Sequence, residues 1–583
     1  MAKTIKRKDR KLNVEVENKK DFIAYDSVKV YARTDIPITP TDTSSVLLTP
    51  TQIWDGFSVE FDKNEVHSIS ETDVLTRYTF CPFLGITTEV FYYHPTTPSQ
   101  KTVLLIGERS RLPQQNLIDA LISKGYAVVV PDYNGVGSPT LTHFSEELAY
   151  GKVGNENGRD QAICPTAKDT CQYLYSAILR KLITFINDIL NKTDIVIVGI
   201  RNGTELAMQV AGLERERVIA LGCICGAGYP ECTDLPKTTG HAFDDMDYEA
   251  LCWMTGVSGV AYMKKYPHPV FAGIGTNGYH SDVDRLSNLA TLISGRLTSS
   301  ISLHCSENIN YKSFSSFLTW LDYVYYKSEY PKEPITVVSQ NSEGYVYANT
   351  TAKRPLPITR AVVYYSYGND DHKTRFWRKS VCQTVGKGEY IARLDISSTC
   401  SYVYYFAEIT YVNGMVLTET PKYKNFADKR ITLSHQKSNA LIFQSGMHDS
   451  IPFSELSVDA VLPDNGVTEI TLPSGVSGAT CKTGSMRIFI GDKCKSITSD
   501  KILQVDNYCN KKTYLLTLKV GFGNGEGEFV AKKSVYGASS FVTTKFSCSD
   551  FKNAQYKPLS SWQNVCSLTI EGQDVVVNKL IFL

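Results

Sequence analysis

The stretch Asp194-Ile195-Val196-Ile197-Val198-Gly199-Ile200-Arg201-Asn202-Gly203-Thr204-Glu205-Leu206-Ala207 decides how this chain is interpreted. An apolar run typical of a buried strand ends in Gly-x-x-x-Gly and passes into a helix-forming segment. This is the outline of a nucleophile elbow, a sharp strand–turn–helix bend that raises one side chain above an α/β sheet. Glycines suit the bend because a Cβ would clash there. The raised residue is Arg201, whose guanidinium stays protonated and has no lone pair with which to act as a nucleophile.

Length and composition describe an ordinary globular protein of several domains. The chain has 583 residues, of which 42% are hydrophobic and 21% are charged. Its 61 basic and 60 acidic side chains leave a net charge of +1. This net charge gives no long-range attraction to nucleic acid or to an anionic membrane. No window approaches the roughly 20 apolar residues that span a bilayer. Residues 1–20 are mostly charged and lack an apolar core, so we expect cytoplasmic synthesis without a signal peptide.

Alternating strand and helix patterns occupy the first half of the chain. Residues 22–95 are β-like, with alternation at 57–61 and 88–93. We then expect strands at 102–106, 126–130, 194–198, 218–225, 269–274 and 300–304, and helices at 114–124, 166–190, 204–212, 282–294 and 313–326. This order predicts a mostly parallel, doubly wound sheet.

The pattern becomes entirely β-like after Pro331-Lys332-Glu333-Pro334, with short alternating strands and tight turns. We therefore predict four regions: a basic flexible arm (1–21), an α/β domain with N-terminal antiparallel strands (22–330), an immunoglobulin- or fibronectin-like β-sandwich (331–432) and a jelly-roll-like β-sandwich (433–583). The fold class is thus α/β followed by two all-β domains.

Four motifs stand at the ends of expected strands: Pro131-Asp132-Tyr133-Asn134-Gly135, the elbow at 199–203, Gly275-Thr276-Asn277, and Ser306-Glu307-Asn308-Ile309-Asn310-Tyr311. With these motifs, residues 80–328 resemble the α/β-hydrolase superfamily, in particular acetyl-xylan esterases and cephalosporin deacetylases. The resemblance implies an α/β-hydrolase fold with a nucleophile, an acid and a base, in that chain order.

Each of the three catalytic positions departs from the pattern that the resemblance implies. Arg201 stands at the nucleophile, Gly278 at the acid, and Tyr311 at the base. The nearest histidine, His304, falls inside the strand expected at 300–304, and Asp282 follows the acid position by four residues. One misalignment does not explain three departures, so we expect a degenerate triad without catalysis.

Arg201 has two further interpretations. Because it begins a helix, it is a candidate anion-binding residue, able to clamp a carboxylate or phosphate. It could equally pair with Glu108, in the turn after the strand at 102–106, and plug the site; we favour the plug.

The 15 cysteines are scattered, and we expect most to be buried and reduced. Cys223, Cys225, Cys232 and His241 do not have the spacing of a zinc site, so we expect structural roles. No metal or other cofactor is predicted.

These observations favour a catalytically degenerate α/β-hydrolase-like protein acting as a structural or binding component, with a self-assembling layer such as a spore coat as one setting. Protein partners or self-association through the β-sandwich domains are expected. A carbohydrate or small carboxylate is a candidate ligand, whereas nucleic acid and a membrane span are not expected. Two alternatives stay open: an active serine-type ester or peptide hydrolase with an unrecognised nucleophile, and a small-molecule sensor that uses the site at Arg201.

Overall fold

A computed structural model describes residues 48–144, 167–226, 229–230, 253–278 and 281–326, and residues 331–583 apart from 353–355, 370–371, 397–399, 401, 427–429, 435–439, 447–451, 455–456, 458, 492 and 523–527. It divides into two compact units. The first takes its described residues from Met1–Gly273, His280–Thr298 and Phe317–Glu329, and the second from Ile274–Tyr279, Ser299–Ser316 and Tyr330–Leu583. The predicted basic arm at 1–21 lies outside the described residues.

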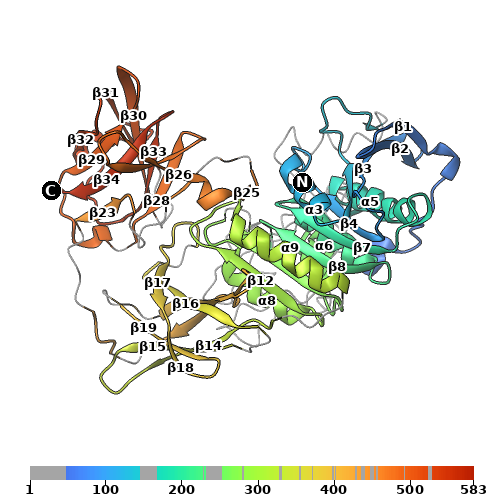
Figure 1. Cartoon of the computed structure of the whole chain (residues 1–583), viewed down its shortest axis with the longest axis horizontal. Helices are drawn as coiled ribbons and strands as arrows, with labels where there is room; N and C mark the ends of the chain where they lie inside the picture. The colour runs from blue at the N-terminus through green and yellow to red at the C-terminus, as the bar shows by residue number, and fades with distance from the viewer. Residues whose placement is uncertain are drawn as a thin grey trace, which may run out of the picture. The chain divides into compact units, whose positions relative to one another are not determined.

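The first unit is built on a mixed β-sheet (Figure 1). In spatial order its strands are β1 (His67–Glu71), β2 (Leu75–Phe83), β3 (Ile86–Tyr93), β5 (Ala127–Asp132), β4 (Lys101–Ile106), β7 (Asp194–Ile200), β8 (Val218–Ile224) and β10 (Val270–Gly275). Pairing is antiparallel from β1 to β5 and parallel from β5 to β10. The parallel strands are near-continuous apolar runs because both faces of the sheet are covered, and β5 and β10 are buried along their whole length.

The helices of this region are α2 (Pro50–Trp54), α3 (Gln115–Ser123), α5 (Cys171–Asp188), α6 (Gly203–Leu213), α8 (Leu286–Leu292) and α9 (Tyr311–Tyr326). The helix predicted at 166–190 begins later, because Thr170 caps it by accepting a hydrogen bond from the Tyr173 N–H. None of these helices, nor any other helix in the described ranges, is long and apolar enough to cross a membrane.

One predicted strand is absent, and the bounds of another are wrong. Residues 57–61 form no strand, since the ring of Phe57 packs edge-on against Trp54 and that of Phe61 against Phe80. The last strand of the α/β region, β12, spans Leu297–Ser302 and not 300–304. It was placed too late because its sequence, Leu-Thr-Ser-Ser-Ile-Ser, has little apolar signal although every residue is buried.

The second unit contains two β-rich regions. In the first, one set of strands has the order β12, β21 (Val416–Thr418), β20 (Tyr402–Tyr411), β16 (Ile358–Tyr367) and β17 (Arg378–Val381), and β22 (Lys422–Asn425) also pairs with β20. A separate sheet has the order β14 (Ile335–Gln340), β15 (Val346–Thr351), β19 (Glu389–Leu394) and β18 (Gln383–Gly386). Apolar residues from both sets share one buried cluster, which includes Val338, Ala392, Val363 and Ala407.

The C-terminal region has two sheets around its own core. One has the order β26 (Val467–Thr471), β27 (Ser477–Cys481), β34 (Val576–Phe582), β29 (Leu503–Tyr508) and β32 (Val542–Phe546), with β23 (Leu441–Gln444) also on β34. The other has the order β24 (Phe453–Ser454), β28 (Ser485–Phe489), β33 (Val565–Glu571), β30 (Thr513–Phe522) and β31 (Phe529–Tyr536). Both sheets contribute to the core, for example Val505 and Leu580 from one and Leu518 and Leu568 from the other.

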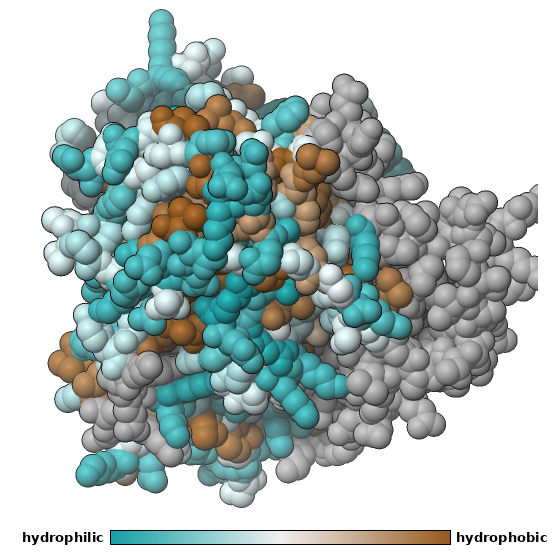
Figure 2. Space-filling view, turned by 90° about the vertical axis from the view of Figure 1, so that its right-hand side faces the viewer, coloured by the Kyte–Doolittle hydropathy of each residue, from teal (hydrophilic) through white to brown (hydrophobic). Residues whose placement is uncertain are grey.

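Exposed apolar side chains do not by themselves identify a binding face. On the face drawn in Figure 2, apolar residues lie in small groups among hydrophilic ones. Leu84 at the β2–β3 turn is 98% exposed and Val74 is 62% exposed. Scattered exposure of this kind is normal on globular proteins.

Candidate functional site

The elbow predicted from the sequence is present in the first unit. β7 ends at Ile200, α6 begins at Gly203, and Arg201 between them has a φ of +49°, a left-handed conformation that is unusual for a residue with a side chain. The Arg201 N–H donates to the carbonyl of Ile224 on β8 (2.7 Å). The bend therefore raises the Arg201 side chain at the carboxyl end of the parallel strands.

The two elbow glycines are required by close backbone approach. A Cβ on Gly199 would lie 2.5 Å from the Cα of Thr204. A Cβ on Gly203 would overlap the carbonyl oxygen of Gly107, in the loop after β4. Only glycine therefore fits at these two positions, because the turn packs closely on α6 and on the loop after β4, as the sequence motif predicts.

The side chain at the nucleophile position forms a buried ion pair. Arg201 Nη1 donates to Glu108 Oε1 at 2.8 Å, and the two side chains are 8% and 12% exposed. Arg111 Nε lies 3.3 Å from the same oxygen, and its side chain is 38% exposed. The pairing with Glu108 that the sequence suggested is thus confirmed.

A second contact joins the elbow to the same loop. The backbone N–H of Arg109 donates to Asn202 Oδ1 at 3.1 Å. The loop after β4 is thus tied to the residue that follows Arg201 in the elbow.

The loop after β5 braces the loop that carries Glu108. Tyr133 donates its hydroxyl to the Gly107 carbonyl (3.1 Å), and Asn134 Nδ2 donates to the Arg109 carbonyl (2.6 Å). Tyr133 is fully buried, which raises the pKa of its hydroxyl and keeps it neutral. Both loops are therefore held by uncharged hydrogen bonds that do not involve the Glu108 carboxylate.

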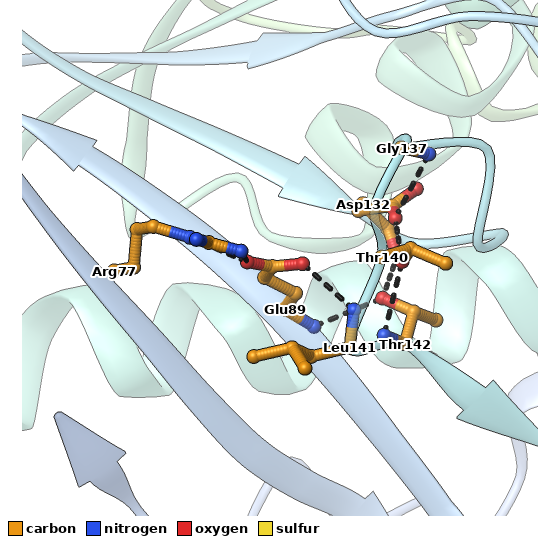
Figure 3. A network of polar contacts seen from close by, with 7 residues as sticks. All are labelled: Arg77, Glu89, Asp132, Gly137, Thr140, Leu141 and Thr142. Carbon is orange, nitrogen blue, oxygen red and sulfur yellow. Dashed lines mark hydrogen bonds and ion pairs between the residues drawn. The ribbon is translucent and has the colours of Figure 1, made fainter. Parts of the chain in front are cut away.

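The remainder of this loop is fixed to the sheet by two buried carboxylates (Figure 3). Asp132 accepts hydrogen bonds from the N–H groups of Val136 (2.8 Å) and Gly137 (3.1 Å) and from the Thr140 hydroxyl. Glu89 Oε1 accepts a hydrogen bond from Arg77 Nε at 2.8 Å, and Glu89 Oε2 accepts one from the Leu141 N–H at 2.9 Å. Buried carboxylates that are satisfied in this way make the loop rigid.

A carboxyl group that the sequence did not single out, that of Glu205, lies in the first turn of α6. Glu205 Oε2 accepts hydrogen bonds from the Gly259 N–H (2.7 Å) and the Ser258 hydroxyl (3.2 Å). Burial raises the pKa of Glu205 above its ordinary value of 4.5, although these hydrogen bonds act in the opposite direction. Nothing in the local sequence distinguishes Glu205 from an exposed helical glutamate.

The acid position lies in the second unit, where it contacts the first β-rich region. The Gly278 carbonyl accepts a hydrogen bond from His372 Nε2 at 2.8 Å. Beside it, the buried Asn277 donates through Nδ2 to the carbonyls of His372 (2.8 Å) and Arg375 (2.9 Å). The turn after β10 thus holds the segment 372–375 through hydrogen bonds that it both donates and accepts.

The base position belongs to the same unit. Tyr311, at the start of α9, is 53% exposed. The sequence predicted His304 inside a strand, and this is wrong. His304 lies two residues after the end of β12 and has a φ of +54°. Its Nε2 accepts the backbone N–H of Trp377 at 3.0 Å, and its ring, 1% exposed, stacks on Phe376.

Of the residues weighed as zinc ligands, Cys223 and Cys225 are buried free cysteines. Cys232 and His241 lie outside the described residues. Within the described residues, no group of three or more His, Cys, Asp or Glu side chains could hold a metal ion.

Comparisons with known proteins give distant matches. No protein-family model and no curated protein matches the chain. Among the similar solved structures, acetyl xylan esterase 1 from Thermoanaerobacterium sp. JW/SL YS485 is 12% identical, with a TM-score of 0.37, over 48% of this chain and 96% of that one. Est1E from Butyrivibrio proteoclasticus, bound to ferulic acid, is 13% identical, with a TM-score of 0.30, over 42% and 96%. An alpha-beta serine hydrolase homologue from Coxiella burnetii is 13% identical, with a TM-score of 0.28, over 45% and 100%. Likenesses this distant say nothing of activity or substrate.

Proposed function

We propose that this chain is a catalytically degenerate α/β-hydrolase-like protein that acts as a structural or binding component. The observation that carries the proposal is the ion pair between Arg201 and Glu108, 2.8 Å long and largely buried at the raised position of the elbow. A guanidinium has no lone pair to attack a carbonyl carbon, and here its charge is engaged by a neighbouring carboxylate.

Hydrogen bonds of His304, the histidine nearest the base position, and of Gly278 support the same proposal. A general base needs an available lone pair near neutral pH. The Nε2 lone pair of His304 accepts the Trp377 N–H (3.0 Å), so His304 serves the fold there. Gly278 has no side chain to orient a base and uses its carbonyl to bind His372 (2.8 Å).

The proposal extends to the organisation of the chain. We propose a mostly parallel, doubly wound α/β domain at 22–330, followed by an immunoglobulin-like sandwich at 331–432 and a jelly-roll-like sandwich at 433–583. The parallel pairing of β4, β5, β7, β8 and β10 and the separate C-terminal core support this division. In such a protein the β domains provide surfaces for protein partners or self-association, as in a self-assembling layer.

Hydrolysis of p-nitrophenyl acetate tests the catalytic part. The expected rate for the purified chain equals that of Arg201→Ala and Tyr311→Phe, and a fluorophosphonate probe labels no serine. Turnover that either variant abolishes, or a serine labelled stoichiometrically, would contradict the proposal and favour an active hydrolase with an unrecognised nucleophile.

Sedimentation velocity tests the structural part. We expect the weight-average sedimentation coefficient to rise with protein concentration, and removal of residues 433–583 to weaken that rise. A single monomeric species at every concentration would argue against self-association.

A further inference from the structure

The elbow and the loop after β4 concentrate positive charge. Residues 107–111 and 201–203 together contain three arginines, Arg109, Arg111 and Arg201, and one carboxylate, Glu108. They lie at the carboxyl ends of β4 and β7, where the chain leaves toward β5 on one side of the sheet and toward β8 on the other. In open α/β sheets this switch point is where ligands bind.

The contacts of the Glu108 carboxylate are those expected for the carboxylate of a bound ligand. Its Oε1 receives the guanidinium of Arg201 at 2.8 Å and that of Arg111 at 3.3 Å. Two guanidiniums converging on one carboxylate oxygen is an arrangement typical of carboxylate recognition. We propose that Arg201 and Arg111 form a carboxylate-binding site that Glu108 occupies in this structure, and that a carboxylate-bearing ligand takes its place. The inference rests on the proposed non-catalytic function, since it gives Arg201 a binding role.

The surroundings of the site do not depend on Glu108. The loop at 107–109 is held by Tyr133, Asn134 and Asn202 through hydrogen bonds of 3.1, 2.6 and 3.1 Å. The backbone of Arg201 is held by Ile224 at 2.7 Å. The backbone that carries Arg201 and the loop at 107–109 therefore keep their places when the Glu108 side chain moves, so the ligand need not order them.

Exchange is sterically and electrostatically feasible. The Glu108 side chain is 12% exposed and that of Arg111 is 38% exposed, so the ion pair borders solvent. A ligand carboxylate restores the charge balance that departure of Glu108 disturbs. A planar monoanion matches the group already held there, and this favours a carboxylate over a phosphate.

An internal competitor lowers the apparent affinity by the fraction of molecules in which the site is open. Removing the competitor should therefore expose the binding. We would titrate the full chain with 13C-acetate, follow the line width of the acetate signal, and compare wild type with Glu108→Gln, which keeps an acceptor for Arg201 but not the charge. Glu571→Gln is the matched control, because it removes a carboxylate from an ion pair with Lys519 (2.9 Å) elsewhere in the chain.

We expect Glu108→Gln to bind acetate at least about tenfold more tightly than wild type and Glu571→Gln to behave as wild type. The double variant Glu108→Gln/Arg201→Met should lose the gain. Identical titrations of Glu108→Gln and wild type would overturn the proposal, as would binding in the double variant equal to that in Glu108→Gln.

A second variant keeps the test decisive if Glu108→Gln fails to fold. Glu108→Asp retains the charge on a side chain one methylene shorter, so it weakens the competitor without removing it. Its affinity for acetate should lie above that of wild type, and equality with wild type would overturn the proposal. Ester hydrolysis by the wild-type chain would refute the non-catalytic function without altering these titrations, so the two failures are distinguishable.

Discussion

The buried ion pair at the elbow predicts a specific loss of stability when Arg201 is replaced by methionine. Methionine fills a similar volume but leaves Glu108 without its closer partner. Removing one member of a buried ion pair costs about 3–5 kcal/mol when the remaining charge is left uncompensated. The Glu108 side chain is 12% exposed and keeps Arg111 at 3.3 Å. We therefore expect a smaller loss of stability than that range, about 2–3 kcal/mol.

Hydrogen–deuterium exchange measured by mass spectrometry suits this test, because a chain of several domains has no single unfolding free energy. A loss of about 2 kcal/mol corresponds to roughly 30-fold faster exchange of amides in β7 and α6 that open locally. Replacing the partly exposed Arg111 by glutamine should cost at most about 1 kcal/mol, as for surface pairs.

A double-mutant cycle isolates the pair itself. Arg201→Met/Glu108→Gln removes the orphaned charge, so it should exchange more slowly than Arg201→Met alone. Exchange in Arg201→Met that stays within about threefold of wild type would refute the reasoning, because the pair would then contribute under about 0.7 kcal/mol. A double variant as unstable as the sum of the single variants would refute the coupling.

Three further changes give distinct outcomes. Gly203→Ala drives a Cβ into the Gly107 carbonyl and should cost several kcal/mol, measured as much faster hydrogen exchange in β7 and α6, whereas Gly475→Ala, with nothing within 4 Å, should cost only roughly 1 kcal/mol for its positive φ; equal acceleration of exchange around the two positions would contradict this. Because the pKa of Glu205 is raised above 4.5 in the folded chain, that carboxyl stabilises the fold less as the pH rises through its folded pKa. In Glu205→Gln, amides of α6 should therefore exchange more slowly than in wild type at about pH 8 but not at about pH 4, and a pH-independent difference would argue against it. Asn277→Ala removes hydrogen bonds of 2.8 and 2.9 Å to the carbonyls of His372 and Arg375. It should lower the opening free energy of segment 372–377 by about 2 kcal/mol, measured as faster hydrogen exchange there; unchanged exchange would show that Asn277 does not hold this segment.

What could be predicted from the sequence depended on the range of the interaction. The elbow was predictable because Gly199, Arg201 and Gly203 define it within five residues, and its φ of +49° follows from that local pattern. The pairing of Arg201 with Glu108 was also within reach, since Glu108 follows β4 and β4 pairs in register with β7. Adjacent parallel strands bring the residues at their carboxyl ends together.

Longer-range contacts gave no sequence signal. Asn277 meets His372, 95 positions later, and no periodicity or spacing links the two. His304 was misplaced because β12 is rich in serine, and the buried hydroxyls are satisfied by distant partners such as the Thr418 carbonyl, which accepts from Ser299 at 2.8 Å. Phe57 and Phe61 alternate like a strand but pack on Trp54 and Phe80. In each case tertiary contacts override a local pattern.

The polar contacts at the three positions also bear on how readily catalysis could be installed. A nucleophile introduced as Arg201→Ser would leave Glu108 with only the contact from Arg111 at 3.3 Å. A histidine at position 311 would start from a backbone whose present side chain is 53% exposed, and no acid stands at 278 to orient it. Replacing His304 to free its surroundings would leave the buried N–H of Trp377 without its 3.0 Å acceptor. The substitutions at 201 and 304 therefore destabilise the chain, and we expect Arg201→Ser alone to be less stable than wild type and no more active.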